Sequence, residues 1–210
     1  MMKKNILQIS EFLNELFPSP QCELEYNKDY ELVIAVMLSA QTTDKSVNKV
    51  TKVLFSKYDN LEKLSKADIR EIKEIIKPLG NYNKKAINII EISKKLLKDF
   101  DGIVPRTHTE LESLSGVGRK CANVILGELY NIPSFAVDTH VSRVARRLNL
   151  TKSYDVNVIE QDLMKNFPKD KWTKLHKQFV LFGRYHCKAK NPNCTNCKLK
   201  DICQKEKILS

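Results

Sequence analysis

Apolar residues recur at helical spacing along most of this chain. Ile6, Ile9, Leu13 and Leu16 fall on one face of a helix. Glycine is scarce, at six residues, and the alternation expected of strands is hard to find. The pattern therefore predicts an all-α protein. Four further stripes support it: Val47, Val50, Leu54 and Tyr58; Ile69, Ile72 and Ile76; Ala86, Ile89, Ile90 and Leu97; and Val141, Val144, Ala145 and Leu148.

Capping residues indicate where several of these helices begin. Segment 65–68, which ends in Asp68, is typical of an N-cap, and Pro78 stops the helix that follows. Asn83 is expected to cap the helix that carries Ala86. Asp138 stands just before the last stripe and predicts a helix over 139–149.

One apolar segment has no clear period. Leu32 to Leu38 are seven consecutive apolar residues, which suit a buried strand as well as a buried helix. Because no partner strand is evident elsewhere, we predict a buried central helix.

Residues 107–130 form a candidate hairpin of two helices. Thr107 and Glu110 match a capping box, and a short helix is expected through Leu111 and Leu114. A turn that contains Gly116 and Gly118 follows. A second apolar run then comes, made by Ala122, Val124, Ile125 and Leu129.

The glycine turn of this hairpin has the chemistry of an anion site. Gly116 and Gly118 permit backbone angles closed to other residues and a close approach of a partner. The free N–H groups at the start of the second helix would bind a phosphate. The two glycines alone fit a plain hairpin better than a phosphate site, but Arg119 and Lys120 directly after the turn shift the balance toward phosphate binding.

Four cysteines are concentrated near the C-terminus. Cys187, Cys194, Cys197 and Cys203 have the spacing C-x6-C-x2-C-x5-C on a loop-rich segment. Four thiolates so close in sequence can converge on one metal centre. The spacing alone leaves structural zinc and an iron–sulfur cluster equally open.

Charge and hydropathy limit the binding partners and the cellular compartment that are expected for this protein. The net charge is +11, and 36 basic residues include only seven arginines. An AT-rich genome accounts for many lysines equally well, so the charge makes a nucleic-acid partner plausible without identifying one. No run of 18 apolar residues predicts a membrane span, and residues 1–17 do not resemble a signal peptide. We therefore expect a protein of the reducing cytosol.

Taken together, these motifs resemble the endonuclease III family of DNA glycosylases. The resemblance rests on Leu-Ser-Ala-Gln-Thr-Thr-Asp at 38–44, Leu-Ser-Gly-Val-Gly-Arg-Lys at 114–120, Ala-Val-Asp-Thr-His-Val at 136–141 and the cysteine spacing. It implies an all-α fold of two lobes. Residues 22–132 would form a helical barrel with the helix-hairpin-helix, and 1–21 with 133–210 would form the cluster domain. It also favours a [4Fe–4S] cluster and DNA binding between the lobes.

Two positions depart from the family pattern. Asn81 stands where relatives often carry a bulky apolar residue that wedges into the duplex, so wedging at that site is in doubt. Ser115 replaces a proline common in the hairpin and is expected to loosen the turn modestly. Neither departure affects the predicted chemistry.

The resemblance also implies roles for individual residues. Lys120 would attack the sugar C1′ and expel the base, which leads to a Schiff base and β-elimination. Asp138 would accept a proton and stabilise positive charge on the sugar, although its pattern also fits a helix cap. Gln41 would fill the space of a flipped base, and His140 would lie near the DNA backbone. The full set of expected DNA-binding residues is Gln41, Gly116, Gly118, Arg119, His140 and Arg143.

The expected function is thus removal of damaged pyrimidines from duplex DNA, followed by cleavage of the abasic strand. The expected partner is double-stranded DNA with damaged bases or abasic sites, bound by a monomer in the cytoplasm at the nucleoid. A mismatch adenine glycosylase is disfavoured because such relatives usually lack the hairpin lysine. A non-catalytic DNA-binding or electron-transfer protein remains the alternative from another class.

Overall fold

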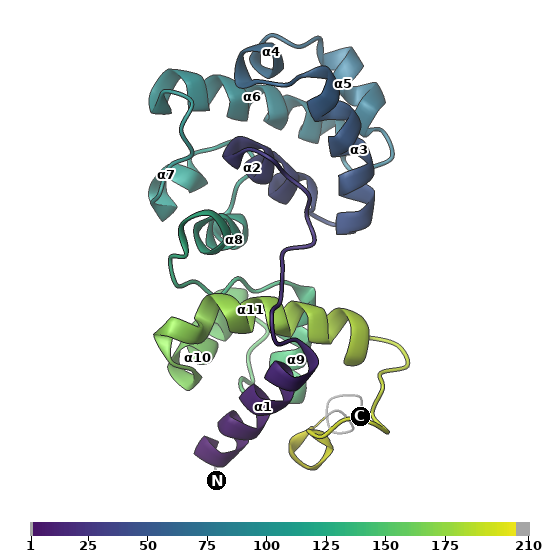
Figure 1. Cartoon of the computed structure of the whole chain (residues 1–210), viewed down its shortest axis with the longest axis vertical. Helices are drawn as coiled ribbons and strands as arrows, with labels where there is room; N and C mark the ends of the chain where they lie inside the picture. The colour runs from purple at the N-terminus through teal and green to yellow at the C-terminus, as the bar shows by residue number, and fades with distance from the viewer. Residues whose placement is uncertain (1, 205–210) are drawn as a thin grey trace. The chain divides into compact units, whose positions relative to one another are not determined.

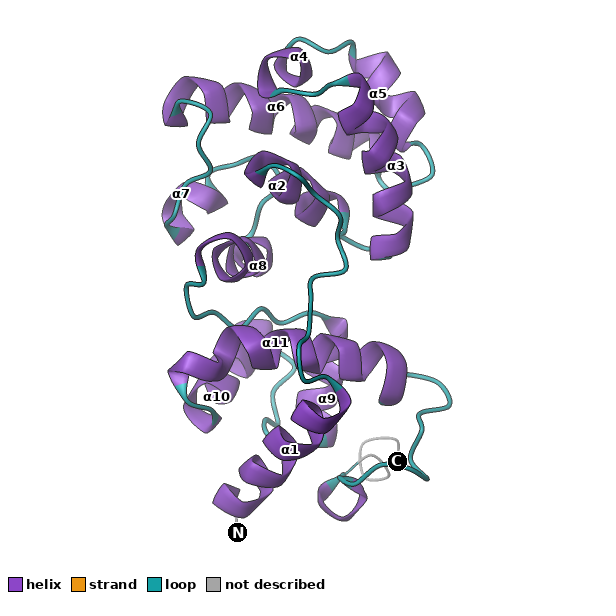
Figure 2. Cartoon of the chain, in the orientation of Figure 1, coloured by secondary structure: helices purple, strands orange, loops and turns teal. Residues whose placement is uncertain are grey.

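The computed structural model describes residues 2–204, with side chains from residue 4 onward. Every regular element in this range is helical, and no strand is found there (Figure 2). The all-α prediction is therefore confirmed. None of these helices combines the length and apolar character needed to cross a bilayer.

The chain divides into two compact units. Cys22–Tyr130 form one unit, and the described residues before and after it form the other. The first unit contains seven helices among its residues. They are α2 (Asp29–Leu38), α3 (Asp44–Lys57), α4 (Leu61–Ser65), α5 (Ile69–Ile76), α6 (Tyr82–Phe100), α7 (His108–Glu112) and α8 (Arg119–Tyr130) (Figure 1).

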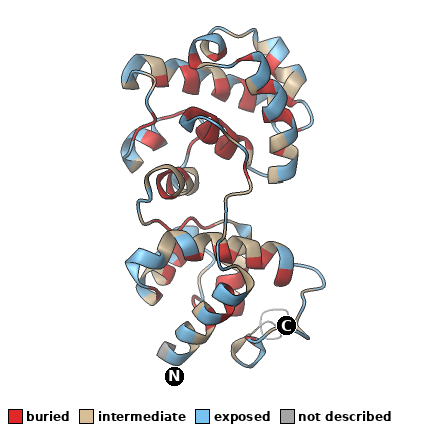
Figure 3. Cartoon of the chain, viewed as in Figure 1, coloured by how far each residue is buried: buried red, intermediate tan, exposed pale blue. Residues whose placement is uncertain are grey.

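Helix α2 is the core of the unit Cys22–Tyr130. Every residue from Tyr30 to Leu38 is buried, and the helix packs on α3, α6 and α8 (Figure 3). The predicted buried central helix is confirmed. The helices that pack on α2 contribute apolar residues to the same core, so α2 is covered by apolar side chains. This explains why its sequence has no polar face.

The second unit has its own core. Its helices are α1 (Met2–Leu16), α9 (Thr139–Arg147), α10 (Val156–Asn166) and α11 (Trp172–Leu181). Phe179 lies at its centre, with edge-to-face contacts to Phe135 and Phe167 at centroid distances of 5.6 and 5.9 Å. A π-helical turn, Phe182–His186, continues α11 toward the cysteines.

Most of the predicted helix starts are found, and one is wrong. Asp68 caps α5 and Asp138 caps α9, as expected. Helix α6 begins at Tyr82, so Asn83 lies inside it and is not the cap. The N-cap position is Asn81, in a left-handed backbone conformation with φ 56°. Asparagine is one of the few residues that adopt this conformation readily, so the chain turns into the helix two residues early.

Candidate active site

The predicted hairpin is formed by α7, a short turn and α8. Thr107 caps α7 by accepting a hydrogen bond from the amide of Glu110 at 3.3 Å. Helix α7 ends at Glu112, earlier than predicted, and Leu114 lies buried beyond it. Val117, in the turn itself, is also buried and belongs to the core of the unit, which holds the turn in place.

The two glycines of the turn differ in what they require. Gly116 has φ +76°, and a Cβ there would come within 2.3 Å of Nδ2 of Asn88. Gly118 has open space around it and an ordinary φ. The expectation that both glycines use restricted backbone angles is therefore correct only for Gly116. Gly118 leaves room for a partner to approach the start of α8.

Lys120 occupies the first turn of α8. Its side chain is half-buried, whereas Arg119 before it is exposed. The amides at this helix start carry partial positive charge and lack intrahelical acceptors, which favours an anion nearby. Cys121 is half-buried beside Lys120, with its sulfur 4.0 Å from the carbonyl oxygen of Val36.

Gln41 lies in a tight turn between α2 and α3. The amide of Thr42 donates to the carbonyl of Ser39 at 3.1 Å, and Gln41 is exposed with φ 56°. This third turn position is normally filled by glycine or asparagine, because it needs a left-handed backbone. A left-handed conformation costs other residues roughly 1–2 kcal/mol, so surrounding contacts must hold Gln41 in place.

Asp138 belongs to the other unit and precedes α9. Its side chain is half-buried, and Oδ1 accepts a hydrogen bond of 2.8 Å from the amide of Val141. The predicted capping role is therefore confirmed. The cap also fixes the direction of the carboxylate, because Val141 itself is fully buried.

His140 and Arg143 follow Asp138 on α9. Nδ1 of His140 lies 3.2 Å from the Arg143 guanidinium, which also donates to the carbonyls of Gly183 and Cys187 at 2.7 and 3.2 Å. A Cβ on Gly183 would come within 2.8 Å of the His140 Cβ. Glycine is thus required there for α9 to approach the π-helical turn. Burial lowers the pKa of Arg143.

The four clustered cysteines lie near one another in the second unit. Burial raises the pKa of the Cys197 thiol, a backbone hydrogen bond with Leu199 opposes this, and the other three thiols add to the rise. All four are half-buried. Among the described residues, no three or more His, Cys, Asp or Glu side chains are placed so that they could hold a metal ion.

Arg147 fastens the first part of this cysteine loop to α9. It is 5% exposed, and its guanidinium donates to the carbonyls of Lys188, Cys187 and Ala189 at 2.8, 3.3 and 3.4 Å. The same group lies 3.3 Å from the sulfur of Cys187. The carbonyl of Arg147 accepts from the amide of Gln204, which ties down the end of the loop as well.

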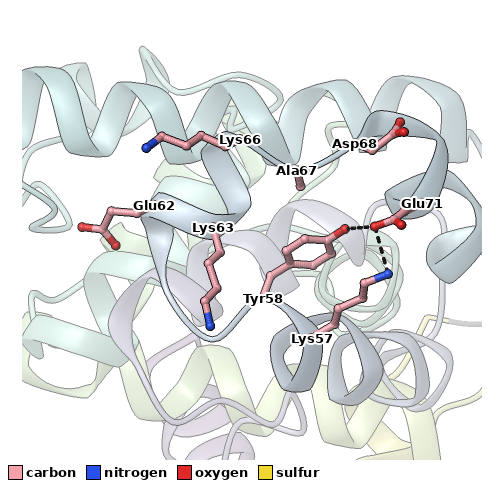
Figure 4. Close-up of a pocket in the computed structure, with 8 residues that line it drawn as sticks. All are labelled: Lys57, Tyr58, Glu62, Lys63, Lys66, Ala67, Asp68 and Glu71. Atoms are coloured by element: carbon pink, nitrogen blue, oxygen red, sulfur yellow. Dashed lines mark hydrogen bonds and ion pairs between the residues drawn. The ribbon is translucent and has the colours of Figure 1, made fainter.

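A separate hollow lies among α3, α4 and α5. Glu71 accepts hydrogen bonds there from the Tyr58 hydroxyl at 2.6 Å and from Lys57 at 2.9 Å (Figure 4). Burial, with the hydrogen bond to Glu71, raises the pKa of Tyr58 to about 12. The polar groups of Tyr58, Lys57 and Glu71 bond to one another. We therefore interpret the hollow as a structural contact between helices.

Comparison with known proteins decides the family. Residues 34–169 match the model of the HhH-GPD superfamily base excision DNA repair protein. The chain belongs to this superfamily. Endonuclease III of Bacillus subtilis is 45% identical over 91% of this chain and 88% of its own length. Endonuclease III of Escherichia coli K12 is 40% identical over 99% of both.

Solved structures agree. The structure described as a trapped endonuclease III–DNA covalent intermediate matches with a TM-score of 0.94 and 41% identity over the whole of both chains. A thermostable thymine-DNA glycosylase, at 21% identity and a TM-score of 0.84, shares the fold. The predicted family, base-excision repair function and enzyme class, DNA N-glycosylase with abasic-site lyase activity, are confirmed.

The repair-enzyme motifs did not indicate three polar residues that the fold makes important. Lys85, Asn88 and Arg147 are all buried, and each bonds to a segment distant in sequence. Their positions on the inner faces of α6 and α9 were the available signal. Lys85 and Asn88 interrupt an apolar stripe three residues apart, which places both on the same side of α6.

Proposed function

We propose that Lys120 is the nucleophile of a bifunctional glycosylase that removes oxidised pyrimidines from duplex DNA. The observation that carries this proposal is the place of Lys120, half-buried in the first turn of α8 behind the glycine turn. A relative with 41% identity over its whole length is described as a covalent intermediate with DNA. An amine that forms a Schiff base accounts for such an intermediate.

The reaction proceeds in two stages. The Lys120 amine attacks C1′ of the sugar, and the base departs with the electron pair of the glycosidic bond. Ring opening gives a Schiff base between Nζ and C1′. Loss of a proton from C2′ then expels the 3′ phosphate by β-elimination, and water releases the lysine. A water nucleophile would stop at the abasic site.

The amine must lose a proton before it attacks. An ordinary lysine has a pKa of about 10.4, and a helix N-terminus disfavours the ammonium by roughly 0.3–1 kcal/mol. An effect of this size does not by itself free the amine of its proton. A proton acceptor is therefore needed, and we assign that role to Asp138, which would also stabilise positive charge on the sugar.

We assign DNA-binding residues on each of the two units by itself. The turn at Gly116 and Gly118, with Arg119, would hold a backbone phosphate, because exposed amides and a cation meet there. Gln41 would fill the space of the flipped base, and His140 would approach the backbone. Arg143 would contribute mainly through its charge, since its guanidinium already bonds to main-chain carbonyls. The site of action would be the nucleoid.

The cysteine loop fits a [4Fe–4S] cluster. Cys187, Cys194, Cys197 and Cys203 lie on one short loop, close enough that the other three thiols add to the rise in the pKa of Cys197. Four thiolates would suit structural zinc as well as an iron–sulfur cluster, and the likeness of the chain to endonuclease III favours the cluster. Because hydrolysis and elimination need no electrons, we assign the cluster a structural role in the proposed domain of residues 1–21 and 133–210. The proposed barrel is 22–132.

Borohydride trapping tests the nucleophile. Wild type incubated with abasic or thymine-glycol duplex and borohydride should give a covalent adduct, and Lys120→Ala should give none. Lys94→Ala, on the exposed face of α6, is the matched control and should trap like wild type. Equal trapping by wild type and Lys120→Ala would overturn the assignment. An undamaged duplex should give no adduct with any variant.

The cluster has its own test. Purified protein should be yellow-brown, with broad visible absorption and about four irons per chain. A colourless protein that contains one zinc per chain would move the site to the zinc alternative.

A further inference from the structure

The buried side chain of Lys85 bonds to both sides of Gln41. Its ammonium donates to the carbonyl oxygen of Ala40 at 2.9 Å and to the hydroxyl of Thr42 at 3.0 Å. Lys85 is only 5% exposed, whereas Ala40 and Gln41 are exposed on the surface of the unit. A charged group is thus held inside the unit to bind a surface turn.

Both the burial of the Lys85 ammonium and the backbone conformation of Gln41 are energetically unfavourable by themselves. Lysine is rarely buried, and burial lowers the pKa of Lys85, which means that the environment disfavours the charged form. Gln41 has a left-handed backbone at a turn position usually taken by glycine or asparagine. A buried ammonium that bonds to the residues before and after Gln41 stabilises that unfavourable backbone directly.

Lys85 also links this turn to a second one. Its amide donates to the carbonyl of Asn81 at 3.1 Å, and Asn81 is likewise left-handed and exposed. Lys85 therefore lies in the helical turn that Asn81 begins while its side chain reaches the turn of Gln41. Lys85 therefore connects two surface positions that both have a left-handed backbone, Gln41 and Asn81.

We propose that Lys85 is a positioning residue that fixes Gln41 in the conformation needed to enter the duplex when a base is flipped out. This inference rests on the proposed role of Gln41. Lys85 would not touch the DNA itself. It would act by making the turn rigid before DNA binds. Gln41 would then lose less conformational entropy when the complex forms.

The test measures the DNA rather than product alone. Full-length protein is bound to a duplex with 2-aminopurine opposite a tetrahydrofuran abasic analogue, because disturbance of the opposite base raises its fluorescence. Lys85→Met keeps the length of the side chain and removes the ammonium. It should reduce the fluorescence rise and weaken binding roughly tenfold, which corresponds to the loss of one charged hydrogen bond. Lys94→Met, exposed on the same helix, should match wild type.

A double-mutant cycle shows whether Lys85 acts through Gln41. In a Gln41→Ala background, Lys85→Met should change fluorescence and affinity less than twofold, because the residue it positions is gone. A tenfold effect in that background would overturn the inference, since Lys85 would then act independently. Equal behaviour of Lys85→Met and wild type would overturn it as well.

A second variant protects the test against misfolding. Thr42→Val removes one of the two acceptors and leaves Lys85 unchanged, so it should cause a smaller loss in the same direction. No loss with Thr42→Val would contradict the inference. Borohydride trapping by wild type separates the two levels. Absence of any wild-type adduct would refute the proposed function, whereas normal trapping with an unaffected Lys85→Met would refute only the role of Lys85.

Discussion

The hydroxyl of Ser115 donates a hydrogen bond of 2.8 Å to Oδ1 of Asn88, a buried residue of α6. Nδ2 of the same amide faces Gly116 and lies 3.8 Å from the sulfur of Met37. The glycine turn therefore rests on one buried side chain. Serine in place of the common proline was expected to loosen this turn, but its hydroxyl supplies a tie that proline could not.

The two glycines of the turn should respond differently to alanine. Gly116→Ala places a methyl group on Asn88 in a left-handed backbone, so the free energy of unfolding should fall by about 2 kcal/mol or more. Gly118→Ala should cost less than about 1 kcal/mol, because the position is open. Chemical denaturation measures both.

Although Gly118→Ala should change stability little, it should weaken the affinity for an abasic-analogue duplex. A methyl group there would keep a phosphate from the amides of α8, so binding should weaken although the fold is stable. Unchanged affinity in Gly118→Ala would show that no DNA group approaches this position closely.

The two roles of Asp138 can be separated with two substitutions. Asp138→Asn keeps a side-chain oxygen for the amide of Val141, so stability should change by less than about 0.5 kcal/mol. Its turnover on a damaged duplex should still fall at least tenfold, because an amide accepts no proton. Asp138→Ala should lose the cap as well, at about 1 kcal/mol. Full activity in Asp138→Asn would leave Asp138 only as a cap.

Arg147 should control how firmly the cysteine loop is held. Lysine cannot reproduce the several N–H groups with which the guanidinium reaches Lys188, Cys187 and Ala189. Arg147→Lys should therefore lower the melting temperature and hasten loss of visible absorption during incubation with an iron chelator. Arg146→Lys, one residue earlier, is the matched control and should behave nearly like wild type. Equal decay in all three proteins would argue against this fastening role.

Local signals in the sequence predicted most of the helices, and the non-local ties escaped them. Asp68, Thr107 and Asp138 were identified as caps because a cap bonds to amides two or three residues away. The cap of α6 was predicted wrongly at Asn83. Two asparagines stand close together there, and it is Asn81, with its left-handed backbone, that occupies the N-cap position.

The catalytic and cysteine motifs were evident because their residues are close in sequence. The supports of the site were not, since their partners are brought together only by folding. Lys85 bonds to residues 45 and 43 positions earlier, and Ser115 bonds to Asn88 27 positions earlier. Helical periodicity reveals that such a polar residue is buried, but not which carbonyl or hydroxyl it meets.

The tie between Tyr58 and Glu71 should be visible in the alkaline stability of the protein. Burial raises the folded pKa of Tyr58 from 10.0 to about 12, so the folded chain keeps a proton that the unfolded chain releases. The resulting stabilisation is complete below pH 10 and is lost as the pH rises toward 12. Tyr58→Phe should therefore lose less stability than wild type between pH 10 and 12. Some slope should remain, because Tyr26 and Tyr30 also have pKa values of about 12. Denaturation at a series of pH values measures the difference, and parallel curves for the two proteins would contradict the assignment.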